Sequence, residues 1–160
     1  MADVDKALAR LGLRLPPVVP PVAVYHPAVR SGEFVYTSGQ LPMVEGALAA
    51  TGKVGAEVDL EQGYDLARIC ALNALAAVAS VAPLDEVAQI VKVVGFVASA
   101  PGFTGQPKVV NGASELLGEV FGEAGTHARS AVGVAELPLG APVEVELIAR
   151  LAPSAKTVLV

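Results

Sequence analysis

The sequence predicts an α+β fold, with a mixed sheet and two main helices packed on one of its faces. Two observations carry this prediction: extended, Val-rich segments pair into two hairpins, and two long helical segments separate them. The order is β-β-α-β-α-β-β after a short N-terminal helix, which suits a sheet whose helices share one face. The other face then needs cover, and assembly of several copies is one way to provide it.

The 160 residues suit one domain that extends over 1–160. Apolar spacing predicts a helix over Val4–Leu13, ended at Gly12. The prolines that follow cannot continue a helix, so we interpret residues 1–21 as a helix and an extended lead-in to the first strand. Residues 153–160 are interpreted as a mobile tail.

Two hairpins frame the rest of the chain. The first joins predicted strands Val22–Val29 and Glu33–Ser38 through Gly32, the residue type that a tight turn favours. The second joins Ser130–Leu137 and Val143–Leu151 through a short loop that contains two prolines. We expect the last two strands to pair antiparallel.

The clearest helix begins after Asp59, with Gln62 three residues later, as in a capping box. Its apolar stripe has small residues that would allow close approach to a sheet. This helix is predicted to end at about Val81, and the segment 43–58 before it is mostly irregular. A Val-rich strand is predicted over Val87–Ser99 and a second helix over Lys108–Phe121.

Composition excludes several classes of protein. Apolar residues make up 53% of the chain and charged residues 17%, unlike a disordered chain. The net charge is -5 and basic residues are scattered, so nucleic-acid binding is disfavoured. The weakly polar stretch 71–84 is too short to span a membrane. With no N-terminal signal pattern, we expect a soluble, cytoplasmic protein.

The residues of metal and covalent chemistry are scarce. The two histidines and the single cysteine are not at metal-ligand spacing, and no phosphate-binding or dinucleotide glycine motif is present. We therefore expect no metal and no cofactor. Cys70 lies on the apolar helix and is interpreted as a core thiol rather than a nucleophile.

The most informative chemistry lies near the C-terminus. Arg129 stands at the entrance of one predicted strand, and Glu144 and Glu146 share a face of the next. One interpretation is a structural Arg–Glu pair that stabilises a sheet edge. The other is an arginine that binds a carboxylate ligand beside a glutamate that handles a proton or water. Spacing alone leaves both open.

A second segment adds a resemblance. The run from Tyr25 to Pro42, which contains Thr-Ser-Gly-Gln-Leu-Pro, combines with Ala-Arg-Ser, Leu-Pro and Val-Glu-Val-Glu after His127. Together with Asn73 and Asn111, these motifs resemble the RidA/YjgF family over roughly residues 22–151. The longer N-terminus and the loops around Gly46 and Phe103 resemble a longer subgroup that is often labelled endoribonuclease-like.

The resemblance implies a chorismate-mutase-like fold that assembles as a homotrimer, with ligand clefts between subunits. It implies hydrolysis of 2-imino and 2-enamino acids to 2-keto acids and ammonia. The catalytic residues would be Arg129, which grips the substrate carboxylate, and Glu144, which activates water. The substrate-binding residues that it implies are Tyr25, Ser38, Gly39, Asn111 and Ala131.

The sequence departs from the family at two positions and leaves alternatives. Ala131 replaces a frequent cysteine and His127 a frequent proline. We interpret His127 and His26 as structural or surface residues. Tyr25 is interpreted equally well as a substrate-binding residue or as an interface aromatic, and the alternative for Ser38 is a residue that only shapes a turn. An endoribonuclease that acts on RNA and a non-catalytic trimer that binds small carboxylates are the alternative functions.

Overall fold

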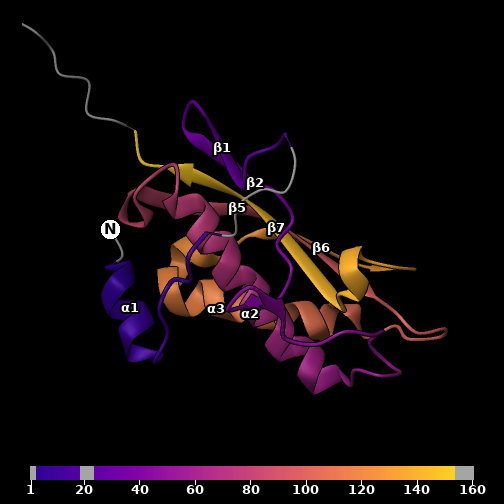
Figure 1. The fold of residues 1–160 in the computed structure, drawn as a ribbon. Coiled ribbons are helices and arrows are strands. Elements are labelled where there is room, and N and C mark those ends of the chain that lie inside the picture. Colours follow the sequence, from indigo (N-terminus) through magenta and orange to yellow (C-terminus); the bar gives the residue numbers. More distant parts are fainter. Residues whose placement is uncertain (1–2, 19–23, 154–160) are drawn as a thin grey trace, which may run out of the picture.

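The computed structural model describes residues 3–18 and 24–153, and its elements follow the predicted order (Figure 1). The helices are α1, α2 and α3, and β1 to β7 are the strands. Their bounds along the chain are α1 Val4–Arg10, β1 Ala28–Ser31, β2 Phe34–Thr37, β3 Met43–Val44, β4 Ala47–Leu48, α2 Leu60–Ala79, β5 Val87–Ala98, α3 Gln106–Phe121, β6 Ala128–Val134 and β7 Val143–Leu151.

The five longer strands form one sheet in the order β1-β2-β7-β5-β6. The predicted C-terminal hairpin is wrong, because β5 lies between β6 and β7. It pairs with β7 antiparallel and with β6 parallel. α3 is the crossover that parallel pairing requires. A short link between two strands therefore does not make them neighbours when a long apolar strand competes for both.

The first hairpin is present but begins later than predicted. β1 starts at Ala28, directly after Pro27, which has no N–H to donate to a sheet ladder. Pairing of Ser31 with Phe34 leaves a two-residue turn in which Gly32 has φ of +62°. The predicted start of this strand at Val22 and the predicted tail lie outside the described residues.

α2 confirms the predicted capping box at Asp59 and Gln62. It packs closely on α3, since a Cβ on Gly112 would lie 2.0 Å from the carbonyl oxygen of Tyr64. The buried side-chain amide of Asn73 donates hydrogen bonds to the Leu41 and Met43 carbonyls, 2.9 and 3.1 Å away. α2 thereby fixes the chain that leaves β2.

Two other predicted boundaries shift by two residues. α3 starts at Gln106, because Pro107 is tolerated in the first helical turn. It ends at Phe121, and Gly122 follows with a φ of +61°. β6 starts at Ala128 instead of Ser130. Arg129 consequently lies inside the strand, where its side-chain direction is set by the sheet.

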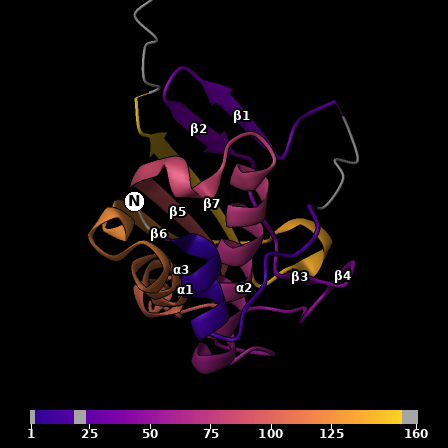
Figure 2. The same ribbon diagram turned by 90° about the vertical axis from the view of Figure 1, so that its left-hand side faces the viewer.

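Helices cover one face of the sheet and leave the other open (Figure 2). Along β7, Val143, Val145 and Leu147 are buried on the helix face. The residues between them, including Glu144 and Glu146, point to the open face, because side chains alternate along a strand. Four large apolar or aromatic side chains are exposed on this face: Val29, Phe34, Tyr36 and Val132.

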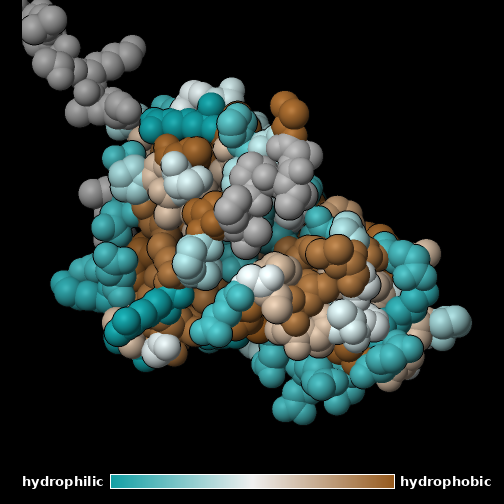
Figure 3. All heavy atoms as spheres, viewed as in Figure 1, coloured by the Kyte–Doolittle hydropathy of each residue, from teal (hydrophilic) through white to brown (hydrophobic). Residues whose placement is uncertain are grey.

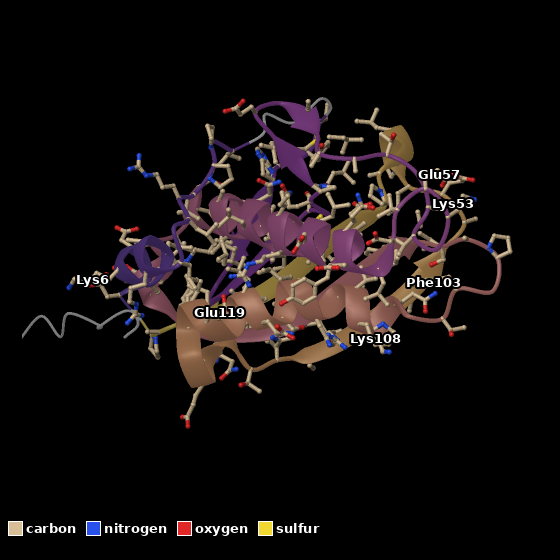
Figure 4. All side chains as sticks on the ribbon, turned by 90° about the horizontal axis from the view of Figure 1, so that it is seen from below. Lys6, Lys53, Glu57, Phe103, Lys108 and Glu119 are labelled. Atoms are coloured by element: carbon tan, nitrogen blue, oxygen red, sulfur yellow. The ribbon has the colours of Figure 1, made fainter. Side chains whose placement is uncertain are left out.

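The segment predicted as mostly irregular holds the small hairpin β3–β4 and then joins the loop after β5. Val54 is fully buried, and its N–H and C=O bond the carbonyl of Ala98 and the N–H of Ala100. Phe103 packs against Gly55, and it lies at the same end of the molecule as Lys53 and Glu57 (Figure 4). The segment 43–58 and the loop around Phe103 therefore form one packed unit.

The surface reflects the low charge of the sequence. Apolar side chains reach it in several places between polar ones (Figure 3). No helix among the described residues is long and apolar enough to cross a membrane.

Candidate functional site

Arg129 lies on the helix face of the edge strand β6. It pairs with Val93 of β5, which is fully buried under the helices, so both side chains point to the same side. Its guanidinium extends to α3 and donates from Nη1 to the Asn111 side-chain oxygen at 2.8 Å and to the Ser114 hydroxyl at 3.2 Å. Nη2 donates to the carbonyl of Pro107 at 3.3 Å. Strand and helix together hold the planar group in place.

All three acceptors of Arg129 are uncharged. They occupy at most three of the five N–H donors of a guanidinium. Within the described part of the chain, no carboxylate lies within ion-pair distance of this side chain. A positioned guanidinium without a counter-charge is suited to bind a carboxylate or a phosphate.

Ser114 and His127 complete this cluster, although the sequence motifs point to neither of them as a site residue. His127 Nδ1 lies 2.6 Å from the Gly125 carbonyl, which can only accept, so Nδ1 carries the proton. In the neutral ring Nε2 is then an acceptor, and the Ser114 hydroxyl donates to it at 2.9 Å. The spacing of Asn111 and Ser114 on one helix face is the signal that could have revealed the cluster.

A surface cavity of about 330 Å³ opens beside these groups. It is lined by Ser114, Gly118, Gly125, Thr126, His127 and Arg129. A larger hollow of about 470 Å³ follows α1 and the chain after it. Its lining is largely apolar, with Asp5 and Arg14 as the charged members, so chemistry rather than size selects the Arg129 cavity.

Glu144 lies on the opposite face of the sheet. It pairs with Phe96, three residues from the Val93 that pairs with Arg129, and no bulge intervenes. Glu144 is half-buried, and its carboxylate packs so closely on Gly39 that a Cβ there would lie 1.9 Å from Oε1. Burial, with a smaller contribution from the charge of Glu146, raises the pKa of Glu144.

The other predicted site residues divide between the two faces. The Ser38 hydroxyl donates to the carbonyl of His26 at 2.7 Å, so it holds the segment that carries the exposed Tyr25. Gly39 joins them through its contact with Glu144. Ala131 follows Arg129 on the helix face and packs against the core.

Within one chain, the predicted site residues therefore fall into two groups on opposite faces of the sheet, which we name the helix-face half-site and the open-face half-site. The helix-face half-site contains Arg129, Asn111 and Ala131, and the open-face half-site contains Tyr25, Ser38, Gly39 and Glu144. The antiparallel pairing that would have brought Arg129 toward Glu144 is absent. Arg129 and Glu144 consequently do not form a structural ion pair within the chain.

Two groups that sequence reasoning considered for other chemistry also have clear positions. Cys70 is fully buried, and its thiol faces the Val143 carbonyl at 3.6 Å. Burial, and to a lesser extent the charge of Glu144, raises the pKa of this thiol, which disfavours the reactive thiolate. Among the residues that the structure describes, no three His, Cys, Asp or Glu side chains cluster as metal ligands.

Comparison with known proteins identifies the architecture around these half-sites. Residues 5–151 match the family model described as "YjgF/chorismate_mutase-like, putative endoribonuclease". The chain belongs to this YjgF family. Protein TCP17 of Trypanosoma cruzi is 45% identical over 146 residues, which cover 90% of this chain and 91% of that protein.

Solved structures of the family share the fold to different extents. A "putative endoribonuclease" from Shewanella oneidensis superposes with a TM-score of 0.89 at 34% identity, over 92% of this chain and 99% of its own. E. coli TdcF, solved with bound serine, has a TM-score of 0.61 at 27% identity, over 87% and 94% of the two chains. The mixed sheet with its helices thus has a chorismate-mutase-like YjgF fold.

Proposed function

We propose that this protein hydrolyses 2-imino and 2-enamino acids to 2-keto acids and ammonia, as a RidA-like deaminase. The observation that carries the proposal is Arg129, a positioned guanidinium with uncharged partners that opens onto a cavity. Its planar fork can hold the substrate carboxylate through two parallel hydrogen bonds. The serine bound to TdcF supports a site for a small molecule with a carboxylate and an amine.

The second half-site supplies a group suited to activate water. The raised pKa of Glu144 makes its carboxylate a better proton acceptor than an exposed one. Imine hydrolysis needs water to be placed and proton transfer to be assisted, and a fixed carboxylate close to the C=N carbon does both. Gly39 and Ser38 hold the chain beside it.

The two half-sites would meet across a subunit boundary. The helix-face half-site of one copy would combine with the open-face half-site of the next copy in a homotrimer. Exposed Phe34, Tyr36 and Val132 on the open face favour its burial in such an assembly. This arrangement explains why one chain separates Arg129 from Glu144.

The first test measures ammonia release from freshly generated 2-iminopropanoate. We expect activity in the wild type and its loss in Arg129→Ala, because the carboxylate loses its anchor. A wild type that releases no ammonia above the spontaneous rate, or an Arg129→Ala variant with full activity, would contradict the proposal.

The second test locates the site. Arg129→Ala and Glu144→Ala, each inactive alone, are unfolded, mixed in equal amounts and refolded together. In a randomly mixed trimer, about one quarter of the boundaries would carry both native residues, so about one quarter of wild-type activity should return. No recovery would contradict a site shared between subunits.

RNA cleavage is the activity named in the family description and in that of the Shewanella protein. The net charge of -5 opposes phosphate binding, so we rank it second. Ribonuclease activity that persists through repurification and is lost in Arg129→Ala would favour it. Binding of pyruvate without any turnover would favour a non-catalytic carboxylate-binding protein.

A further inference from the structure

The helix-face half-site contains a titratable group beyond those that the proposed function uses. His127 and Ser114 line the same cavity as Arg129. They are connected in one chain of hydrogen bonds that runs from the Gly125 carbonyl through His127 and Ser114 to the Arg129 guanidinium. A histidine fixed at one nitrogen and joined to a hydroxyl at the other has the arrangement of a proton-transfer group.

Hydrogen-bond accounting shows what protonation of His127 would change. When the ring is neutral, the Ser114 hydroxyl donates to Nε2 and accepts from Arg129. When the ring is protonated, Nε2–H donates instead, and both lone pairs of the Ser114 oxygen are occupied. The Ser114 hydroxyl then no longer donates to His127, so its proton can be donated into the cavity.

We propose that Ser114 and His127 form a proton relay that serves the nitrogen of a 2-imino acid held on Arg129. This inference rests on the proposed deaminase function and adds a second proton-transfer residue to Glu144. The substrate class follows from the cavity, because Arg129 takes a carboxylate and the relay delivers a proton to a basic atom nearby.

The reaction balances with these groups and one water. As the water oxygen bonds to the imine carbon, Glu144 of a neighbouring copy takes one water proton. The relay starts with His127 protonated on both ring nitrogens. The C=N electron pair moves to nitrogen, which takes the Ser114 hydroxyl proton, and the Nε2 proton of His127 replaces it. The new hydroxyl group on the former imine carbon then gives its proton through Ser114 to His127 as the carbonyl forms. The C–N electron pair leaves with nitrogen, which takes the proton from Glu144 and departs as ammonia.

Arg129 is the charged group that directly joins the relay, and the carboxylates around His127 are exposed or paired elsewhere. On β6 the charged neighbour is Arg129. The α3 carboxylates Glu115 and Glu119 are engaged by Tyr64 and Arg68 of α2. Glu123, in the 3-10 turn before β6, is exposed. A bound substrate carboxylate would therefore change the charge next to the relay substantially.

The kinetic test compares His127→Gln and Ser114→Ala with two matched controls, His26→Gln and Ser80→Ala. We expect kcat to fall about 100-fold or more in the relay variants, while KM stays within about threefold because Arg129 is retained. A relay variant with wild-type kcat would overturn the proposal.

A second measurement judges the relay without relying on turnover. Nitrogen NMR of the histidine rings should show Nδ1–H on neutral His127, and pyruvate should shift its signals in the wild type but not in Arg129→Ala. If the wild type releases no ammonia, the deaminase proposal fails on its own. The relay is overturned by an Nε2–H tautomer or by a His127 signal that does not respond to pyruvate.

Discussion

The two faces of the sheet differ in how they hold functional groups. On the helix face, Arg129 is fixed by three hydrogen bonds to α3 and its first turn. On the open face, Glu144 is held by burial and by its contact with Gly39. A cation is thus positioned by directional contacts, whereas a carboxylate is tuned by loss of water.

The two faces present complementary groups. The helix face presents a guanidinium that no carboxylate of the described residues pairs with, and the open face presents a carboxylate whose raised pKa favours proton transfer. Neither half-site contains the full set of groups that hydrolysis of a charged substrate requires. Four substitutions test what each face contributes.

The largest expected effect concerns the packing that supports the helix-face half-site. Gly112→Ala would place a methyl group against the Tyr64 carbonyl and force α2 and α3 apart. We expect it to lower the free energy of unfolding by about 3 kcal/mol, measured by chemical denaturation. Gly118→Ala lies on the same helix, and the added carbon would meet no atom within 4 Å beyond its chain neighbours and the adjacent helix backbone. It should be neutral or stabilising.

A smaller effect tests the directional contacts of the helix face. Arg129→Lys keeps the charge but loses the planar fork, so KM for 2-iminopropanoate should rise about 100-fold. Arg150→Lys on the open face is the matched control and should behave as wild type. Equal KM values in all three proteins would mean that charge alone, rather than geometry, binds the substrate.

On the open face, Gly39→Ala should reduce kcat about 10-fold with little loss of stability. The new methyl group would displace the Glu144 carboxylate, the mobile end of a side chain, rather than the backbone. Steady-state kinetics and thermal melting check the two parts. A variant that loses stability but keeps kcat would show that Gly39 serves the fold instead of the site.

The smallest effect concerns the stability cost of Glu144. Its folded pKa exceeds the unfolded value of about 4.3, so the native state binds more protons between these two values. The free energy of unfolding therefore falls as pH rises through that window. Glu144→Gln should raise Tm at pH 7, and the gain should disappear below about pH 4. Exposed Glu123→Gln should change Tm at neither pH.

Residue type and order place Arg129 and Asn111 in one predicted site, and the structure joins the two side chains through a hydrogen bond. Their roles in binding stay a prediction. Ser114 and His127 were missed because their roles depend on how α3 lies over β6. Side-chain direction on a strand and a helix can be inferred from sequence, but their relative rotation depends on packing.

The fold shows the same division. The capping box at Asp59 and the strand Val143–Leu151 are local features, and both are confirmed. The partner of β6 is a long-range choice, and the short loop before β7 pointed to the wrong strand. The apolar strand β5 followed by α3 was the better signal, because such a crossover favours a parallel neighbour.

The β5–α3–β6 crossover has a consequence for how this site could change. One continuous stretch of chain, residues 107–129, folds back on itself beside the sheet. It contains all five groups of the Arg129 cluster: Pro107, Asn111, Ser114, His127 and Arg129. The open-face half-site instead depends on β2 and β7, which are far apart in sequence. The groups around the Arg129 cavity are thus encoded by one segment. Under the proposed function, exchange of this segment between relatives would carry a new substrate preference with it.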